Sequence, residues 1–168
     1  INKDFGFNKT DRHLALLPFG HTASINYNIL PALMVGSELY ISRGFENMNI
    51  SFFKLLKKFN ITYTQVVPSI LFILNKMNIK ISKNFLPKLK FLGCGSSYLP
   101  LSKQKEFIKK YKIKVANLYG LSETGPTHID DPRLKNWKPG SIGKPLSVCK
   151  FKLDKNGNIL IKGKNLFT

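Results

Sequence analysis

Short apolar runs alternate with longer amphipathic stretches over the first 120 residues of the chain. The short runs are rich in β-branched and aromatic side chains, which is typical of strands. They predict strands at residues 12–19, 37–42, 61–68, 88–97 and 112–120. The stretches between them have apolar residues at helical spacing and predict helices at residues 23–36, 49–60, 68–78 and 100–111. This alternation predicts an α/β fold, with a mostly parallel sheet and flanking helices formed by repeated βα units.

Proline and glycine mark the limits of two of these helices. Gly36 follows the last apolar residue of the first helix and is expected to end it. Pro31 lies inside the same stretch and predicts a bend or a later start there. Pro68 stands where the third helix is expected to begin.

The pattern changes after Pro126. Residues 128–146 are rich in turn-forming side chains and predict a long connection. Residues 149–163 predict two strands joined across Lys155-Asn156-Gly157, because Asn-Gly favours a hairpin turn. We therefore expect an α/β part at residues 1–126, and a connection with the start of a β-rich part at residues 127–168.

Length and composition fit one domain, or part of a larger one. The chain has 168 residues, of which 43% are apolar, enough for a substantial core. No apolar run approaches the ~20 residues of a membrane-spanning helix, and no secretory leader is recognisable at Ile1, so we expect a cytoplasmic protein. The two cysteines, Cys94 and Cys149, indicate neither a disulfide framework nor a metal cluster.

The formal charge of +18 raises the alternative of a basic protein that binds nucleic acid or an acidic membrane. Base and phosphate recognition favours arginine, but only Arg12, Arg43 and Arg133 are arginines. The lysines are scattered along the expected helices and loops, which indicates a compositional bias. Nucleic-acid binding would require the lysines to gather on one face with exposed aromatic residues between them. We do not expect a nucleic-acid partner.

Three predicted strands end in unusual residues, at positions 18–21 (PFGH), 93–97 (GCGSS) and 119–123 (YGLSE). Because ligands of open α/β sheets bind at the carboxyl ends of the strands, we expect these segments to lie at one edge of the sheet. The second segment, with Gly95, Ser96 and Ser97, could hold a ligand against its main chain. A tight turn with a serine capping the next helix explains it equally well.

The segment YGLSE holds more distinctive chemistry. The Tyr119 ring could stack on a purine, and Gly120 allows a turn beside a ligand. Ser122 could donate a hydrogen bond to a phosphate oxygen, and Glu123 could bind Mg²⁺ together with phosphate oxygens. A glutamate at the start of a helix is the alternative. For His21, the alternative is a half-buried histidine that caps the next helix.

The order of the motifs resembles that of the adenylate-forming enzymes, which are the acyl-CoA synthetases, the luciferases and the adenylation domains of peptide synthetases. The segment NLYGLSETG is similar to the family's Tyr-Gly-x-Thr-Glu signature. The resemblance covers nearly the whole chain. The other segments that carry it are LLPFGHTAS, VVPSILFIL, LKFLGCGSSYLP, KPGSIGKPL and LDKNGNILIKGKNLF.

This resemblance implies a two-step reaction. A carboxylate attacks the α-phosphate of ATP in the presence of Mg²⁺, and a thiol, usually that of CoA, then takes the acyl group. By position, Tyr119 and Gly120 would border the AMP moiety, Ser122 would contact the α-phosphate, and Glu123 would bind Mg²⁺. His21 would lie near the carboxylate end of the acyl pocket. The residues expected to border the adenine are Gly95, Ser96, Ser97 and Tyr98.

The segment around His21 also bears on the substrate. Amino-acid-activating relatives place an aspartate in this neighbourhood, whereas this chain has FGHTAS, with no acidic residue. The resemblance therefore implies a fatty or aromatic carboxylic acid. Departures from the family pattern are the SSY of residues 96–98, in place of Gly-Ala-Pro, and Ser24, in place of a glycine.

Several parts expected of the family are not found in the 168 residues. These are the phosphate loop ending in Pro-Lys-Gly, the aspartate that holds the ribose, the hinge and the C-terminal domain with its lysine. We therefore expect a fragment of a ligase that acts together with the rest of its parent protein and is inactive alone. The alternative is a non-catalytic nucleotide-binding or interaction module.

Overall fold

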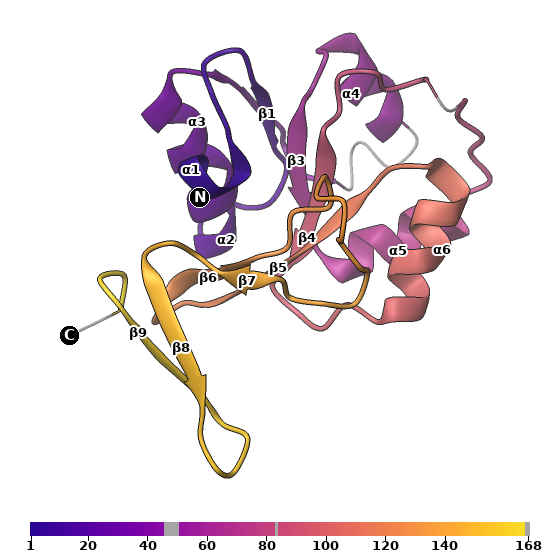
Figure 1. Ribbon diagram of the computed structural model, residues 1–168. Helices are drawn as coiled ribbons and strands as arrows, with labels where there is room; N and C mark the ends of the chain where they lie inside the picture. The colour runs from indigo at the N-terminus through magenta and orange to yellow at the C-terminus, as the bar shows by residue number, and fades with distance from the viewer. Residues whose placement is uncertain (46–50, 83, 167–168) are drawn as a thin grey trace.

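The computed structural model describes residues 1–45, 51–82 and 84–166 (Figure 1). The helices are α1 (Asn2–Phe5), α2 (Thr22–Ser24), the π-helix η1 (Ile25–Ile29), α3 (Leu30–Val35), α4 (Phe52–Lys58), α5 (Pro68–Lys76) and α6 (Leu101–Tyr111). The strands are β1 (Arg12–Ala15), β2 (Glu38–Ile41), β3 (Tyr63–Val66), β4 (Phe91–Gly95), β5 (Val115–Leu121), β6 (Gly125–Ile129), β7 (Lys144–Pro145), β8 (Cys149–Leu153) and β9 (Ile159–Gly163).

The main sheet has the order β2-β1-β3-β4-β5-β6-β7. The first five of these strands are parallel to their neighbours, and β6 and β7 continue the sheet in antiparallel pairing. The hairpin of β8 and β9 forms a separate sheet that projects from the body of the molecule (Figure 1). The prediction of a mostly parallel α/β fold that ends in a hairpin is therefore confirmed.

Each predicted strand and helix has a counterpart among the described residues, usually shorter than expected. β1 ends at Ala15 instead of position 19. Residues 49–50 of the helix predicted at residues 49–60 lie outside the described residues. The predicted turn-rich connection at residues 128–146 is shorter than expected, because β6 and β7 occupy its two ends. The division at residue 126 stays a prediction; β6 runs through that position.

The two faces of the sheet pack against different helices. Leu92 of β4 belongs to the core formed with α4, α5 and α6, whereas its neighbour Phe91 enters a second core with Phe5, Phe7 and Tyr27. Burial on both faces explains why these strands are nearly continuous apolar runs. In the described part of the chain, no helix has the length and apolar character needed to cross a bilayer.

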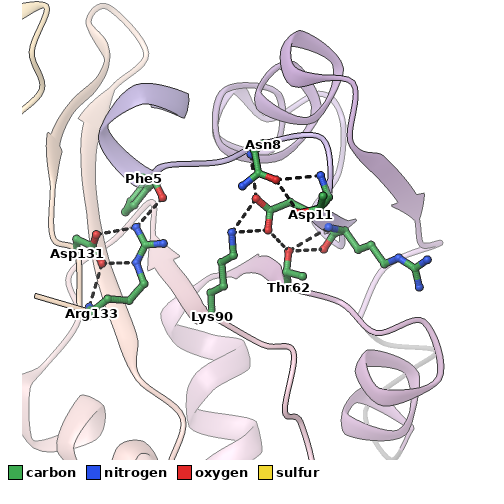
Figure 2. Close-up of polar contacts among 9 residues, drawn as sticks. Phe5, Asn8, Asp11, Thr62, Lys90, Asp131 and Arg133 are labelled. Carbon is green, nitrogen blue, oxygen red and sulfur yellow. Dashed lines mark hydrogen bonds and ion pairs between the residues drawn. The ribbon is translucent and has the colours of Figure 1, made fainter.

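The amino-terminal edge of the sheet is held together by a buried carboxylate (Figure 2). Asp11, just before β1, is 1% exposed and accepts hydrogen bonds from Thr62 Oγ1 at 2.7 Å, Lys90 Nζ at 2.8 Å and the Asn8 amide at 3.0 Å. Burial alone would raise the pKa of Asp11, but these donors outweigh it and lower that pKa. Since Thr62 and Lys90 precede β3 and β4, one carboxylate connects the starts of three neighbouring strands.

The connection after β6 is attached to the N-terminal segment through Arg133 (Figure 2). Its guanidinium binds the Asp131 carboxylate at 2.7 and 2.8 Å and donates to the Phe5 carbonyl at 2.5 Å. It also lies 5.2 Å from the ring centre of Phe91. These contacts hold α1 against the core on the side of β4.

The substitution Lys90→Met is expected to lower the free energy of unfolding by about 2 kcal/mol, because it removes a charged donor from a buried carboxylate. The matched control is Lys103→Met, which breaks the exposed Lys103–Glu106 pair and is expected to cost less than about 1 kcal/mol. Urea unfolding of the two variants measures the difference. Equal costs would contradict a structural role for the Asp11 network.

The burial of His13 is expected to lower the free energy of unfolding in mild acid. It is fully buried, neither ring nitrogen has a partner among the described residues, and burial lowers its pKa to about 4. The unfolded chain therefore binds the proton first, near pH 6.5, and stability falls by up to about 3 kcal/mol as the pH drops towards 4.

The variant His13→Phe lacks this titration and should lose less stability between about pH 7 and about pH 4.5. Urea unfolding of both proteins at the two pH values provides the comparison. The same acid-induced loss in both would contradict the assignment to His13.

Candidate active site

Loops that follow β1, β4 and β5 meet in one pocket of about 200 Å³. The first loop contributes His21, the second Ser96, and the end of β5 with its turn contributes Gly120 and Ser122. This arrangement confirms that the three segments lie at one edge of the sheet. The other lining residues are Thr22, Ala23, Asn26, Tyr27, Leu118, Leu121, Gly125 and Pro126.

A second pocket, of about 350 Å³, shares Ser96, Leu118, Gly120 and Leu121 with the first. Its remaining walls are Ser97, Tyr98, Leu99, Asn117, Tyr119 and Ile142. The carboxyl end of β5 thus separates two adjoining pockets. Together they contain every expected site residue except Gly95 and Glu123.

Gly95 contributes by being small. A Cβ atom there would lie 2.6 Å from the Leu118 main-chain oxygen, so only glycine lets the ends of β4 and β5 approach this closely. Ser96 follows with φ 72°, in the left-handed region. The alternative of a serine N-cap is wrong, because α6 is preceded by Pro100 and no side chain caps it.

Glu123 lies on the tight turn between β5 and β6, formed by residues 122–124. No helix follows it, so the alternative of a glutamate at a helix start is wrong. Its side chain is exposed, lines neither pocket, and has no hydrogen-bond or ion-pair partner among the described residues. It is adjacent in the chain to Ser122, which does line the first pocket.

The main chain at Tyr119 is fixed from two sides. Its carbonyl accepts hydrogen bonds from Tyr27 Oη at 3.2 Å and from Thr127 Oγ1 at 3.4 Å. Its ring packs edge-on against His128, with 5.5 Å between the ring centres. Burial raises the pKa of Tyr27, so its hydroxyl remains a donor over the physiological pH range.

Tyr27 reaches the site from η1, which the sequence did not predict. Pro31 has no amide hydrogen to donate to the carbonyl of Tyr27, and the helix widens so that the Leu30 amide bonds to Ile25 O, five residues back. Tyr27 and Asn26 were missed because they lie within a stretch expected to be a regular helix. The only hint was the polar run at residues 26–28, which interrupts the apolar pattern.

His21 caps α2, and this part of the alternative interpretation is confirmed. Its Nδ1 accepts a hydrogen bond from the Ala23 amide at 3.1 Å, which leaves Nε2 as the nitrogen that carries the proton in the neutral ring. The side chain is exposed, not half-buried. It borders the first pocket and a third, largely apolar one of about 480 Å³ whose walls include Leu16, Val67 and Ile70.

The chemistry of the turn is compatible with a magnesium ion shared with phosphate. Among the described residues, no group of three histidine, cysteine, aspartate or glutamate side chains could hold a metal without help. Glu123 offers one carboxylate beside the Ser122 hydroxyl. Because Mg²⁺ commonly combines one or two carboxylates with substrate phosphate oxygens, Glu123 fits this ion only when a phosphate is bound nearby.

Comparison with protein families gives one match, to the profile described as AMP-binding enzyme, over residues 1–168. Among curated proteins, the chain is 27% identical to marinolic acid–CoA ligase of Pseudoalteromonas sp. (strain SANK 73390), over 90% of this chain and 24% of that protein. It is also 27% identical to 2-succinylbenzoate–CoA ligase of Geobacillus sp. (strain WCH70), over 97% of this chain and 34% of that protein. The chain thus spans a quarter to a third of the length of these relatives.

Solved structures show the same fold. The ATP-bound MatB from Rhodopseudomonas palustris matches 99% of this chain, with a TM-score of 0.85 and 19% identity, and 34% of MatB is covered. The O-succinylbenzoate coenzyme A synthetase MenE from Bacillus subtilis, in complex with ATP and a magnesium ion, matches 98% of this chain, with a TM-score of 0.79 and 22% identity. In MenE, 35% of the chain is covered.

Gly120→Ala is expected to damage both the fold and the pockets. An added Cβ would lie 2.3 Å from the Gly125 main-chain oxygen and force β5 and β6 apart, which should cost about 1–3 kcal/mol. Gly20→Ala is the control, since a Cβ there has no atom within 4 Å and the residue does not require a positive φ. Urea unfolding compares the two, and equal stability would contradict the close approach at Gly120.

Proposed function

Because the chain belongs to the family of AMP-binding enzymes, we propose that it contributes the centre of the active site of an AMP-forming acid–thiol ligase. The observation that carries the proposal is the pair of joined pockets at the carboxyl end of β5. They bring together, from three loops, the residues that the family motifs identify, except Gly95 and Glu123. The CoA ligases among its relatives support the same class of reaction.

In this proposal the nucleotide occupies the second pocket. The half-buried Tyr119 ring packs edge-on against His128 and offers a face for the adenine, and Ser97 and Tyr98 also line this pocket. The Ser122 hydroxyl donates a hydrogen bond to an oxygen of the α-phosphate. Glu123 holds Mg²⁺, which when bound neutralises the charge that develops on the phosphate oxygens.

The carboxylic acid occupies the first pocket, because Ser122 and therefore the α-phosphate border it. A carboxylate oxygen forms a bond to the α-phosphorus while the bond to pyrophosphate breaks, which yields the acyl-adenylate. None of the described residues that line the first pocket is an aspartate or glutamate, so a ligand ammonium group would have no carboxylate partner there. This favours a plain fatty or aromatic acid over an amino acid.

The thiol, that of CoA or of a carrier protein, approaches from the third pocket. His21 lines both this pocket and the first, so a thiol sulfur beside His21 would lie next to the pocket proposed to hold the acyl group. The thiol loses its proton to solvent, and the sulfur forms the thioester bond as the bond between the acyl carbon and the AMP oxygen breaks. The rest of the parent protein supplies the parts of the site that these 168 residues do not.

Glu123→Gln is expected to weaken binding of ATP with Mg²⁺ by about tenfold, because an amide oxygen is a poor substitute for a carboxylate ligand. Binding of AMP without metal should change by less than about twofold, since the adenine wall is intact. Glu106→Gln, on the exposed face of α6, is the control. Isothermal titration calorimetry measures the affinity of the original 168-residue chain and of both variants for each ligand.

Two results would contradict the proposal in different ways. If Glu123→Gln leaves the affinity for ATP with Mg²⁺ unchanged, the glutamate does not bind the metal. If AMP binds and Mg²⁺ has no effect on ATP binding even before substitution, the chain is better described as a nucleotide-binding module without ligase chemistry.

A further inference from the structure

Asn165, just after β9, lies against the turn that carries Ser122 and Glu123. Its side-chain amide donates to the main-chain carbonyl of Thr124 and, at 3.3 Å, to that of Pro126. These two carbonyls flank Gly125, which lines the first pocket. The contacts join segments about forty residues apart in the chain, from two different sheets.

The orientation of the Asn165 amide follows from its partners. Its nitrogen has two hydrogens, and each has a carbonyl acceptor. Its oxygen accepts a hydrogen bond from Cys149 Sγ at 3.2 Å. Room for this group depends on Gly163, because a Cβ there would lie 2.5 Å from Asn165 Oδ1. The hairpin is therefore shaped to admit an amide at this position, and a carboxylate would face two carbonyl oxygens.

The turn also has hydrogen bonds of its own, including one from Thr124 Oγ1 to the Gly125 carbonyl at 2.9 Å. Within it, the Leu121 amide donates to Thr124 Oγ1 at 3.1 Å and the Thr124 amide to Leu121 O at 3.3 Å. The pairing of β5 with β6 shifts register between Tyr119 and Gly120 and then continues to the turn through the pairs Gly120–Pro126 and Leu121–Gly125. Among the hydrogen bonds of the described residues, those from Asn165 are the ones that reach this turn from outside the main sheet.

A second contact connects the same hairpin to the nucleotide pocket. The ring of Phe151 in β8 packs edge-on against His128, with 5.1 Å between ring centres, and His128 packs in the same way against Tyr119. The projecting hairpin therefore supports the site at two points. Phe151 packs on His128, which packs on the Tyr119 ring proposed to stack on adenine. Asn165 binds the turn proposed to hold the metal.

We infer that Asn165 is a positioning residue for the metal and phosphate part of the site, and that it acts through the carbonyls of Thr124 and Pro126. The identity of the ligand at this turn rests on the proposed function, whereas the restraint of the turn by Asn165 does not. Without Asn165, the turn should sample more conformations. The binding component that depends on Glu123 should then weaken, while the adenine wall should be less affected because Tyr119 has its own hydrogen bonds.

The test compares Asn165→Ala and Asn165→Asp with Asn156→Ala, a control at the tip of the same hairpin whose side chain has no hydrogen bond among the described residues. The first measurement, without ligand, is amide hydrogen exchange at Leu121 and Thr124. Exchange should accelerate about tenfold in Asn165→Ala, and at least as much in Asn165→Asp because of repulsion from the two carbonyls. The Leu92 amide, which donates to Lys114 O in the parallel part of the sheet, should exchange at its original rate.

The second measurement is calorimetric binding. Affinity for ATP with Mg²⁺ should fall about fivefold or more in both Asn165 variants, whereas affinity for metal-free AMP should change by less than about twofold. Asn156→Ala should match the original chain in both measurements.

Unchanged exchange at Leu121 and Thr124 would overturn the inference. So would acceleration of the same size at Leu92, since that would show only a general loss of stability. If the unsubstituted chain binds no nucleotide, the proposed function fails, while the exchange rates still decide whether Asn165 positions the turn. Equal weakening of AMP and metal-dependent binding would also contradict the inference, because Asn165 would then not act selectively through the turn.

Discussion

A Cβ atom at Gly95 would lie 2.6 Å from the main-chain oxygen of Leu118, and one at Gly120 would lie 2.3 Å from that of Gly125. At both positions, main chain packs directly on main chain. This contact brings the loop after β4 beside the turn after β5, and it creates the wall shared by the two pockets. The side chains proposed to act on a nucleotide are adjacent only because the strands beneath them have no side chain at these points.

The amino ends and the carboxyl ends of the parallel strands differ in structure. At the amino-terminal edge, the Asp11 carboxylate connects the starts of β1, β3 and β4 through Thr62 and Lys90, and the contacts are buried. At the carboxyl edge, loops with exposed polar residues surround open pockets. A rigid edge opposite an open one allows the loops to carry function on a fixed frame. The hairpin of β8 and β9 adds a support from outside that frame, through Asn165 and Phe151.

Much of this arrangement could be predicted from the sequence, because local patterns decide where the parallel strands and their helices form. The rule that ligands bind at the carboxyl ends of such strands was enough to group His21, Ser96 and Ser122. Contacts between distant segments could not be predicted in this way. Gly125 and Pro126 are typical turn residues, yet they form β6 because β5 supplies the pairing partner. The hydrogen bonds of Asn165 and the π-helix that presents Tyr27 likewise depend on tertiary structure or on a missing amide hydrogen.

The central claim is that the loops after β4 and β5 form one nucleotide site, although the chain has a charge of +18 that would attract any phosphate. Titration of the isotope-labelled chain with AMP, followed by amide chemical shifts, tests this most directly. The account predicts saturable shifts concentrated at residues 95–98 and 118–125. Shifts confined to the lysines of α6, or spread over the surface and abolished by moderate salt, would contradict it and indicate non-specific attraction of an anion to a basic protein.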